Sequence, residues 1–524
     1  MAAVVLRQRP FRLFKYNKYN LDMRVCARGF EGVIMQAIKK QKLDFTEGKI
    51  FFKLLRFVLP IVATNLLQTF YNAADMMIVS LSAEENAVGA IGMTNSFLTL
   101  ILNIFIGFSV GANVVVAREI GAKNKERTQN AVHTSLLMAV IFGVVGGAVG
   151  IGVSSSVITL MGASGNLHTL ATRYTYIYLA GAPFLALTNY LIAIFRAKGD
   201  SKTPLIVLAL SGLLNVGLNL LFVLGIGLSV EGVAIATVTA NVASFLVMLL
   251  KLRRDKDYTT FSFRKLKING AAFKDIVING VPAGIQGALF SLSNMLIQSS
   301  IVTVNNNVVG AESEYAPVVN GNAAAGNIDS FVYMAMNAVY QGTITVTSQN
   351  IGAKKIKRVK RVMYSCLLAS VGVGVTVSGI AYIFREPLLA LYGIKGGEGL
   401  EAVALESALV RFNYMVLPYF LCGIMEVCCG VLRGMGKSIV STVISLVGSC
   451  LLRVVWLLSV FPLRQTLPMI YISYPVTWLI TAGAMFITIK VLLKGMMKKQ
   501  RESLALASAT DSEEVVLGVE DESI

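Results

Sequence analysis

The hydrophobic pattern of this chain is a series of long apolar runs separated by short polar connections. A run of about 20 apolar residues is long enough to cross the hydrocarbon core of a bilayer as a helix. Such runs lie near residues 52–81, 87–117, 131–161, 174–196, 203–228, 230–252, 275–304, 324–350, 362–384, 408–432, 438–461 and 466–493. The pattern therefore predicts an all-α integral membrane protein with 12 transmembrane helices.

The composition agrees with this fold class. Of the 524 residues, 55% are hydrophobic and 15% are charged, whereas about a quarter of residues are charged in soluble proteins. A net charge of +18 would suggest nucleic acid as the partner of a soluble protein, but in membrane proteins basic residues collect in cytoplasmic loops. We therefore expect the lipid bilayer as a partner and no nucleic acid. The six cysteines have no metal-binding or disulfide spacing.

Charge alternates from one connection to the next, and this predicts the orientation of the chain. Lys and Arg cluster after the second, fourth, sixth and eighth runs, for example at Arg253–Arg254 and in the segment 354–361. The intervening connections carry Glu84, Glu231 and Glu312 with almost no Lys or Arg. By the positive-inside rule, both termini are predicted to be cytoplasmic.

The segments outside the apolar runs differ in character. Residues 1–48 form a basic N-terminal extension without the apolar region of a signal peptide, and residues 256–274 form a cytoplasmic linker. Residues 496–524 turn acidic and have no apolar face. This C-terminal tail is therefore predicted to be disordered.

Two short motifs occur twice in the chain. Ile120–Lys123, with the sequence IGAK, recurs as Ile351–Lys354 at an offset of 231 residues. Arg196–Ser201 recurs in degenerate form as Arg433–Ser438 at an offset of 237 residues. Self-similarity at such an offset indicates that the chain contains two copies of one structural unit.

Each copy holds six of the predicted helices, an even number, so both copies enter the membrane from the same side. We expect an N-lobe at 49–255 and a C-lobe at 275–495, related by a pseudo-two-fold axis along the membrane normal. Sites in such repeats lie near the midplane between the copies.

The motifs of the chain resemble those of the multidrug and toxic compound extrusion (MATE) transporters, in particular a bacterial, Firmicutes-like branch. The resemblance covers about 45–495 and rests on Tyr71–Asp75, Gly111–Lys123, Arg196–Pro204, Asn215 with Asn219, Gly232–Thr237, Gln349–Lys354 and Tyr474–Trp478. Counterparts of this branch start near Met35, which makes residues 1–34 a candidate for a mis-called start.

The resemblance implies a secondary active antiporter in the bacterial cytoplasmic membrane. It would extrude amphiphilic, often cationic drugs or toxic compounds in exchange for H+ or Na+ by alternating access. It would be a monomer, would need no cofactor, and would not be an enzyme.

Ionisable groups are rare in the predicted spans and each is costly in the hydrocarbon layer. Asp75 matches the acidic residue that the family uses for cation coupling, and Asn215, Asn219 and Thr237 match positions around it. These four residues form a possible Na+ site, although Asn219 stands where many members carry Asp. The candidates for the coupling site and the substrate cavity are Asp75, Asn189, Asn215, Asn219, Thr237, Asn294, Asp329 and Glu426.

The second half carries two acids and a base inside predicted spans, namely Asp329, Glu426 and Arg453. Some members carry a Glu in the seventh span, where this sequence offers Asn294 among its polar residues. We expect Arg453 to form an ion pair with Glu426 or, as the alternative, with Asp329. Whether each acid is structural or a coupling carboxylate stays open.

The alternative function is that of a lipid-linked oligosaccharide flippase of the related superfamily. Such a cavity needs several Arg or Lys residues for a pyrophosphate, and we expect only Arg453 inside a span. An embedded enzyme would need a cluster of nucleophile, base or metal ligands, and the motifs of the sequence indicate none.

Overall fold

The computed structural model describes residues 43–82, 84, 86–310 and 315–520. The chain divides into two units, Met1–Gln41 and Lys42–Ile524, and all features below belong to the second unit. The predictions for residues 1–42 and the acidic residue Glu312 lie outside the described residues.

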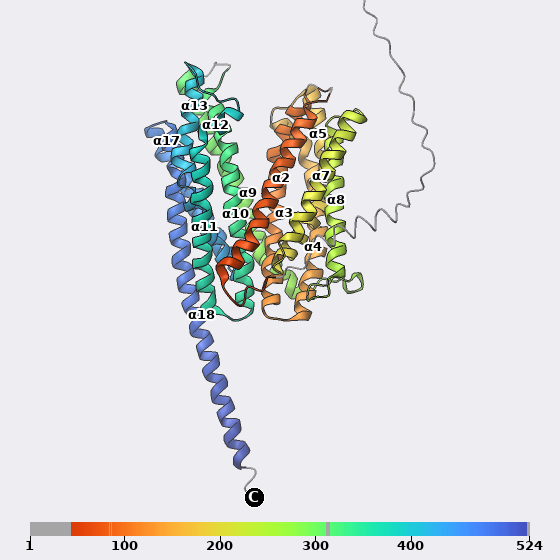
Figure 1. Cartoon of the computed structure of the whole chain (residues 1–524), viewed down its shortest axis with the longest axis vertical. Coiled ribbons are helices and arrows are strands. Elements are labelled where there is room, and N and C mark those ends of the chain that lie inside the picture. Colours follow the sequence, from red (N-terminus) through yellow and green to blue (C-terminus); the bar gives the residue numbers. More distant parts are fainter. Residues whose placement is uncertain (1–42, 83, 85, 311–314, 521–524) are drawn as a thin grey trace, which may run out of the picture. The chain divides into compact units, whose positions relative to one another are not determined.

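The described residues fold into helices without strands, as expected where backbone polar groups have no water to bond. The first bundle (Figure 1) consists of α2 (Ile50–Val79), α3 (Ala87–Gly121), α4 (Lys125–Leu160), α5 (Gly165–Ala180), α6 (Ala182–Ala197), α7 (Lys202–Asn219), the π-helix η1 (Leu220–Gly225) and α8 (Val230–Arg254).

The second bundle follows a loop with a short 3₁₀ turn, η2 (Phe263–Lys265). It consists of α9 (Gly270–Val309), α10 (Pro317–Gly352), α11 (Ile356–Ile383), α12 (Arg385–Leu391), α13 (Leu400–Arg411), η3 (Phe412–Val416), α14 (Tyr419–Gly434), α15 (Ser438–Ser445), η4 (Leu446–Leu451), α16 (Leu452–Ser459), η5 (Phe461–Leu463), α17 (Leu467–Tyr471) and α18 (Ser473–Glu520).

The predicted fold class is confirmed. Within the described ranges, 9 helices are long and apolar enough to span a membrane, or up to 11 if each of two bent pairs is one span. The remaining predicted run, 324–350, corresponds to α10. Its 36 residues are about 54 Å long, but its many polar side chains keep it outside that apolar set.

Two spans predicted as continuous helices are bent. The run 174–196 is divided between α5 and α6, which meet at 51°, and the run 408–432 is divided between α13–η3 and α14, which meet at 41°. The first bend lies at Gly181, next to Pro183, and the second lies at Pro418. Proline lacks a backbone N–H and its ring collides with the preceding turn, which bends or breaks a helix.

The C-terminal tail differs from the prediction of disorder, because α18 continues to Glu520. Adding residues to an existing helix is far easier than starting a new one. The segment after Lys498 is rich in good helix formers, and Lys498 lies 3.9 Å from Glu502 at the favourable i, i+4 spacing.

The two copies of the IGAK motif contact one another reciprocally. A Cβ at Gly121 would overlap the carbonyl oxygen of Gln349, and a Cβ at Gly352 would overlap that of Arg118. Gln349 and Arg118 each lie three residues before the other glycine, so the contact is the same in both directions. The equivalent lysines Lys123 and Lys354 also share a positive φ, of 56° and 54°. Reciprocal contacts between equivalent residues are what a pseudo-two-fold axis between the two bundles produces.

The Gly352 contact leads to a stability prediction. We expect Gly352→Ala to destabilise the folded protein by about 1–3 kcal/mol, because the added methyl group needs a backbone shift at the contact between the bundles. Gly372→Ala on α11 is the matched control, since a Cβ there meets nothing within 4 Å. Thermal unfolding in detergent compares the two variants, and equal midpoints would contradict a tight contact at Gly352.

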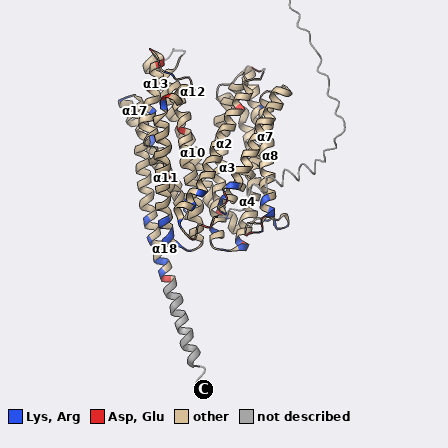
Figure 2. Ribbon diagram, in the orientation of Figure 1, with Lys and Arg blue, Asp and Glu red and all other residues tan. Residues whose placement is uncertain are grey.

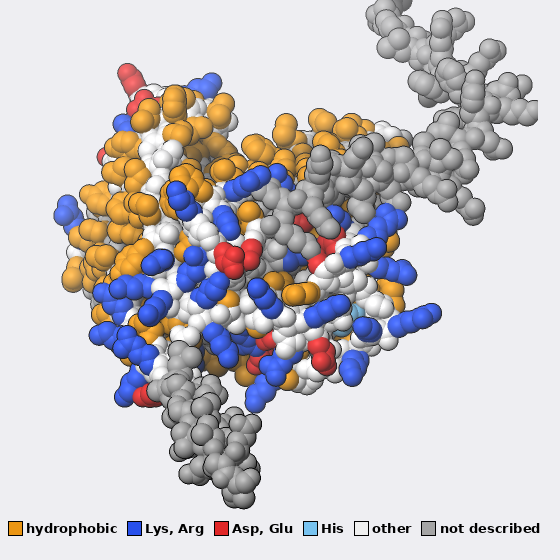
Figure 3. Space-filling model, turned by 60° about the horizontal axis from the view of Figure 1, so that its bottom comes forward, with side chains coloured by type: hydrophobic (Ala, Val, Ile, Leu, Met, Phe, Trp, Pro, Cys, Tyr) orange, Lys and Arg blue, Asp and Glu red, His pale blue; other side chains and the backbone are white. Residues whose placement is uncertain are grey.

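The bundles meet close to the end of the molecule that carries the Lys and Arg residues, here called the basic end. Beyond the IGAK contact, a Cβ at Gly107 or Gly111 of α3 would overlap the backbone of α9. Figure 2 shows Lys and Arg concentrated at the lower end of the helices, and Figure 3 shows them spread over that face. The exposed basic residues here include Lys123, Arg253 and Lys354.

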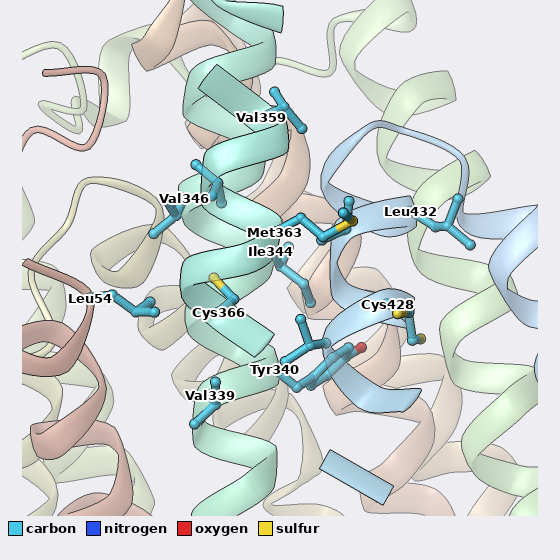
Figure 4. Packing of buried hydrophobic residues seen from close by; sticks show 14 of the residues in the cluster. Leu54, Val339, Tyr340, Ile344, Val346, Val359, Met363, Cys366, Cys428 and Leu432 are labelled. Atoms are coloured by element: carbon cyan, nitrogen blue, oxygen red, sulfur yellow. The ribbon is translucent and has the colours of Figure 1, made fainter. Parts of the chain in front are cut away.

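A hydrophobic core joins α10 to helices of both bundles. Leu54 of α2 belongs to the same buried cluster as Val339, Tyr340 and Ile344 of α10. Figure 4 shows α10 at the centre of this cluster, with Met363 of α11 beside it. α10 is therefore the central helix that positions the polar groups described next.

Candidate functional site

The first polar cluster lies in the first bundle and contains four of the predicted residues. Nδ2 of Asn219 on α7 donates to Oδ1 of Asp75 on α2 and, at 3.4 Å, to Oδ1 of Asn215. Nδ2 of Asn215 donates to the Thr237 hydroxyl of α8 at 3.3 Å, and Thr237 is a further hydrogen-bond partner of the Asp75 carboxylate. The structure thus brings together Asp75, Asn215, Asn219 and Thr237.

Helix geometry explains why these side chains meet. Asn215 and Asn219 are one turn apart on α7 and so share a face, and that face is directed toward α2 and α8. Asn219 is fully buried and Asn215 is 5% exposed. Asp75 and Thr237 are half-buried, so the accessible side of the network lies at these two residues.

The cluster presents one negative charge and several neutral oxygens. The Oδ1 atom of Asn219 is buried without a hydrogen-bond partner among the described residues. The described part of the chain holds no group of three or more His, Cys, Asp or Glu side chains that could bind a metal ion. A cation at Asp75 would therefore meet one carboxylate, supplemented by hydroxyl and amide oxygens.

Two other predicted residues lie apart from this cluster. Asn189 on α6 donates to the carbonyl oxygen of Leu185 in its own helix, at 2.9 Å. Asn294 on α9 is exposed and has no hydrogen-bond partner within the described ranges. Neither residue joins the Asp75 cluster in this conformation.

The second polar cluster lies in the second bundle and is built around an ion pair. Nη2 of Arg411 on α13 lies 2.6 Å from Oδ2 of Asp329 on α10, and Nε of Arg411 lies 2.8 Å from the same oxygen. Nη1 of Arg411 donates to Oδ1 of Asn322, which also accepts from the Tyr471 hydroxyl at 2.7 Å. Asp329, Asn322 and Tyr471 are all buried.

The predicted pairing of Arg453 is wrong. Arg453 forms no ion pair with Glu426 or Asp329 in the described structure, although it is only 3% exposed. Its Nη2 donates to the Thr477 hydroxyl at 3.3 Å, and its guanidinium lies 3.9 Å from the centre of the Tyr474 ring. The rotation of α16 directs Arg453 toward α18, and the partner of Asp329 comes from α13 instead.

Glu426 on α14 is 8% exposed and forms no hydrogen bond or ion pair within the described residues. Arg433, two turns farther along the same helix, interacts with its charge at longer range. Arg433 itself donates to Tyr340 and, through Nη2 at 2.8 Å, to Oε1 of Gln286 on α9. Glu426 is thus the acid of the second bundle without a directly bonded base.

Three buried or half-buried arginines of the polar clusters were not predicted as site residues from the sequence. Arg411 lies inside the predicted run 408–432, so the statement that only Arg453 lies inside a span was wrong. Arg196 and Arg433 belong to the repeated motif but were assigned to connections. The structure places both of them against consecutive residues of α10, since Arg196 donates to Gln341 and Arg433 to Tyr340. The repeat itself was the available signal.

The segment 43–48, which was predicted to belong to the N-terminal extension, packs against the ends of α10 and α11 at the basic end. The carbonyl oxygen of Phe45, which is fully buried, accepts from Asn350 at 3.2 Å and from Arg358 at 3.3 Å. Burial alone would raise the pKa of Asp44, but hydrogen bonds from Thr46 and the nearby lysines lower that pKa below its usual value.

Comparisons with known proteins agree with this arrangement. A family model described as MatE matches residues 60–221 and 282–458, together more than half of the chain. The probable multidrug resistance protein YoeA of Bacillus subtilis is 27% identical over 397 residues, which are 74% of this chain and 82% of that protein. The multidrug export protein MepA of Staphylococcus aureus strain N315 is 21% identical over 426 residues, which are 80% of this chain and 90% of that protein.

A solved structure described as the outward-facing conformation of a multidrug resistance MATE family transporter of the MOP superfamily shares the fold. Its TM-score is 0.78 at 20% identity, over 88% of this chain and 100% of that chain. The family model matches both halves of the chain, and these matches cover most of α2, all of α3–α7 and most of α9–α16. The chain therefore belongs to the MatE family, the multidrug and toxic compound extrusion transporters.

Proposed function

We propose that this protein is an antiporter that exports amphiphilic, often cationic compounds in exchange for H+ or Na+. The observation that carries this proposal is the cluster around Asp75, where an intramembrane carboxylate is hydrogen-bonded by Asn219. Intramembrane carboxylates are costly and are functional candidates by default. The names of the relatives, which describe multidrug resistance and multidrug export, support the direction and the substrates.

A single accessible carboxylate can couple two ligands. A cation from outside and a cationic compound from inside are both attracted to Asp75, and one negative charge stabilises one of them at a time. Exchange follows when each ligand can leave only on its own side of the membrane.

Alternating access would use the contact between the bundles. In this conformation the contacts at Gly121, Gly352 and along α3–α9 lie toward the basic end. Rocking of the first bundle against the second would open this end and close the other. The reciprocal IGAK contact lies at the end that would open, so its two halves would separate from one another in this step.

The test of the proposal is transport by the purified full-length chain in proteoliposomes. We expect movement of a fluorescent cation such as rhodamine 6G when an outward-to-inward proton or sodium gradient is imposed, and the two gradients are applied separately. An ionophore that collapses the effective gradient should abolish the movement. Transport that continues without either cation gradient would overturn the antiport proposal.

The orientation is a second proposal, namely that the basic end and both termini are cytoplasmic. We expect an impermeant thiol reagent applied to intact cells to modify Glu398→Cys, between α12 and α13, and to spare Lys256→Cys, after α8. Both positions are exposed in the structure, and the native cysteines are first replaced. Labelling of Lys256→Cys alone would reverse the assignment.

The flippase alternative is not favoured. The buried arginines of the second bundle are engaged with protein groups, because Arg411 pairs with Asp329 and Arg433 bonds Tyr340 and Gln286. They therefore do not form a free cluster for a pyrophosphate.

A further inference from the structure

α10 has a polar face whose hydrogen-bonding groups are satisfied only in part by the surrounding residues. At the spacing of one helix face, it carries a row of neutral polar side chains that are exposed or half-buried. This polar strip consists of Asn320, Asn327, Ser330, Tyr333, Asn337 and Gln341. No Lys, Arg, Asp or Glu belongs to it.

The polar strip is not suited to contact with lipid tails. Each unsatisfied polar group in hydrocarbon has a free-energy cost of roughly several kcal/mol. The neighbours of the strip are residues of α2 in the other bundle. Asn65 donates to the carbonyl oxygen of Met334 at 3.3 Å, and the Phe70 ring lies 6.1 Å from the Phe331 ring. The strip therefore lies beside α2, along the boundary between the bundles.

Part of the polar strip forms a hydrogen-bonded ladder with a defined direction. Arg196 of the first bundle donates to Oε1 of Gln341, Nε2 of Gln341 donates to Oδ1 of Asn337, and Nδ2 of Asn337 donates to the Tyr333 hydroxyl oxygen at 3.4 Å. Because a guanidinium only donates, the orientation of both amides follows from Arg196. Each bond polarises the next one along such a chain.

The ladder ends at a free donor. The Tyr333 oxygen accepts from Asn337, so its hydrogen is available. Among the residues that the structure describes, no acceptor lies within hydrogen-bond distance of it, and the Glu426 carboxylate interacts with Tyr333 only electrostatically. The side chain of Tyr333 is 39% exposed. The positive charge of Arg196 at the far end favours donation at this end.

We propose that the Tyr333 hydroxyl binds an acceptor oxygen of the transported compound, such as an ester, ketone or carboxylate oxygen. The substrate class is therefore amphiphilic compounds that combine an apolar body with such an oxygen. The protein would thus recognise an acceptor oxygen of the compound in addition to its positive charge. This inference rests on the proposed function, because it assigns the polar strip to the substrate path.

The test compares two lipophilic cations that differ in acceptor oxygens. Rhodamine 6G carries an ester carbonyl, whereas tetraphenylphosphonium has no hydrogen-bonding atom. We expect Tyr333→Phe to weaken rhodamine 6G binding to the purified full-length protein by about twofold to tenfold, the range of one net hydrogen bond. Tetraphenylphosphonium binding should not change. Isothermal titration calorimetry measures both.

Two further variants sharpen the result. Asn337→Leu keeps the hydroxyl but interrupts the ladder, so it should weaken rhodamine 6G binding less than Tyr333→Phe does. Tyr364→Phe removes a hydroxyl from an exposed tyrosine on α11 and should change neither affinity.

The outcomes separate the substrate site from the transport mechanism. Unchanged rhodamine 6G binding in Tyr333→Phe, an equal loss for both cations, or absence of rhodamine 6G binding to the unaltered chain would each overturn the assignment. Normal, selective binding without cation-driven transport would instead overturn the antiport proposal and leave the Tyr333 site standing.

Discussion

Asp75→Asn is expected to reduce cation-driven efflux to the level of protein-free liposomes while the protein stays folded. The substitution removes the only charge of the cluster with Asn215, Asn219 and Thr237, so neither cation would be held there. It should not destabilise the fold, because an uncharged amide is less costly in the membrane interior than a carboxylate. Transport of rhodamine 6G in proteoliposomes measures the effect.

The control for Asp75→Asn is Glu231→Gln, which removes an acid at the beginning of α8. Glu231 lies 3.3 Å from the exposed Arg173, and exposed pairs contribute little to stability. Glu231→Gln should retain transport. Undiminished proton- or sodium-driven efflux by Asp75→Asn would remove this carboxylate from the mechanism.

The largest stability effect is expected at the ion pair between Arg411 and Asp329. Arg411→Met leaves the buried Asp329 without its base and also removes a donor from Asn322. Removing one partner of a buried pair typically costs about 3–5 kcal/mol, because the other charge stays buried. We expect a strong fall in the thermal unfolding midpoint, in the yield of folded protein, or in both.

The double variant separates charge burial from loss of packing. Adding Asp329→Asn to Arg411→Met should restore most of the stability, since a buried pair contributes little relative to neutral side chains of similar size. Adding Glu426→Gln should restore none of it. Effects of Arg411→Met and Asp329→Asn that simply add would contradict the pair.

Arg453 provides the contrasting case. Its partners are the Thr477 hydroxyl and the Tyr474 ring, so Arg453→Met strands no carboxylate. It should be clearly less destabilising than Arg411→Met. If Arg453→Met proves the more damaging of the two and Glu426→Gln rescues it, the pairing seen here is not the one that stabilises the protein.

The spans and the repeat could be predicted from the sequence because both are local properties. A membrane helix satisfies its backbone hydrogen bonds within one segment, so twenty apolar residues indicate it without knowledge of the neighbours. The IGAK motifs likewise indicated the two bundles, and the spacing of Asn215 and Asn219 placed both on one face of α7. Asp75 and Thr237 were assigned to the same cluster only through the resemblance to the MATE family, and the structure brings all four side chains together.

The ionic partners of the second bundle were decided by tertiary structure alone. Arg411 and Arg453 both lie within predicted spans, and hydropathy does not say which of them faces Asp329. The choice depends on the bend at Pro418 and on the rotations of α13 and α16, which result from packing between helices distant in sequence. The ladder from Arg196 to Tyr333 likewise joins two bundles, because a side chain finds a partner across a helix interface only after the interface has formed.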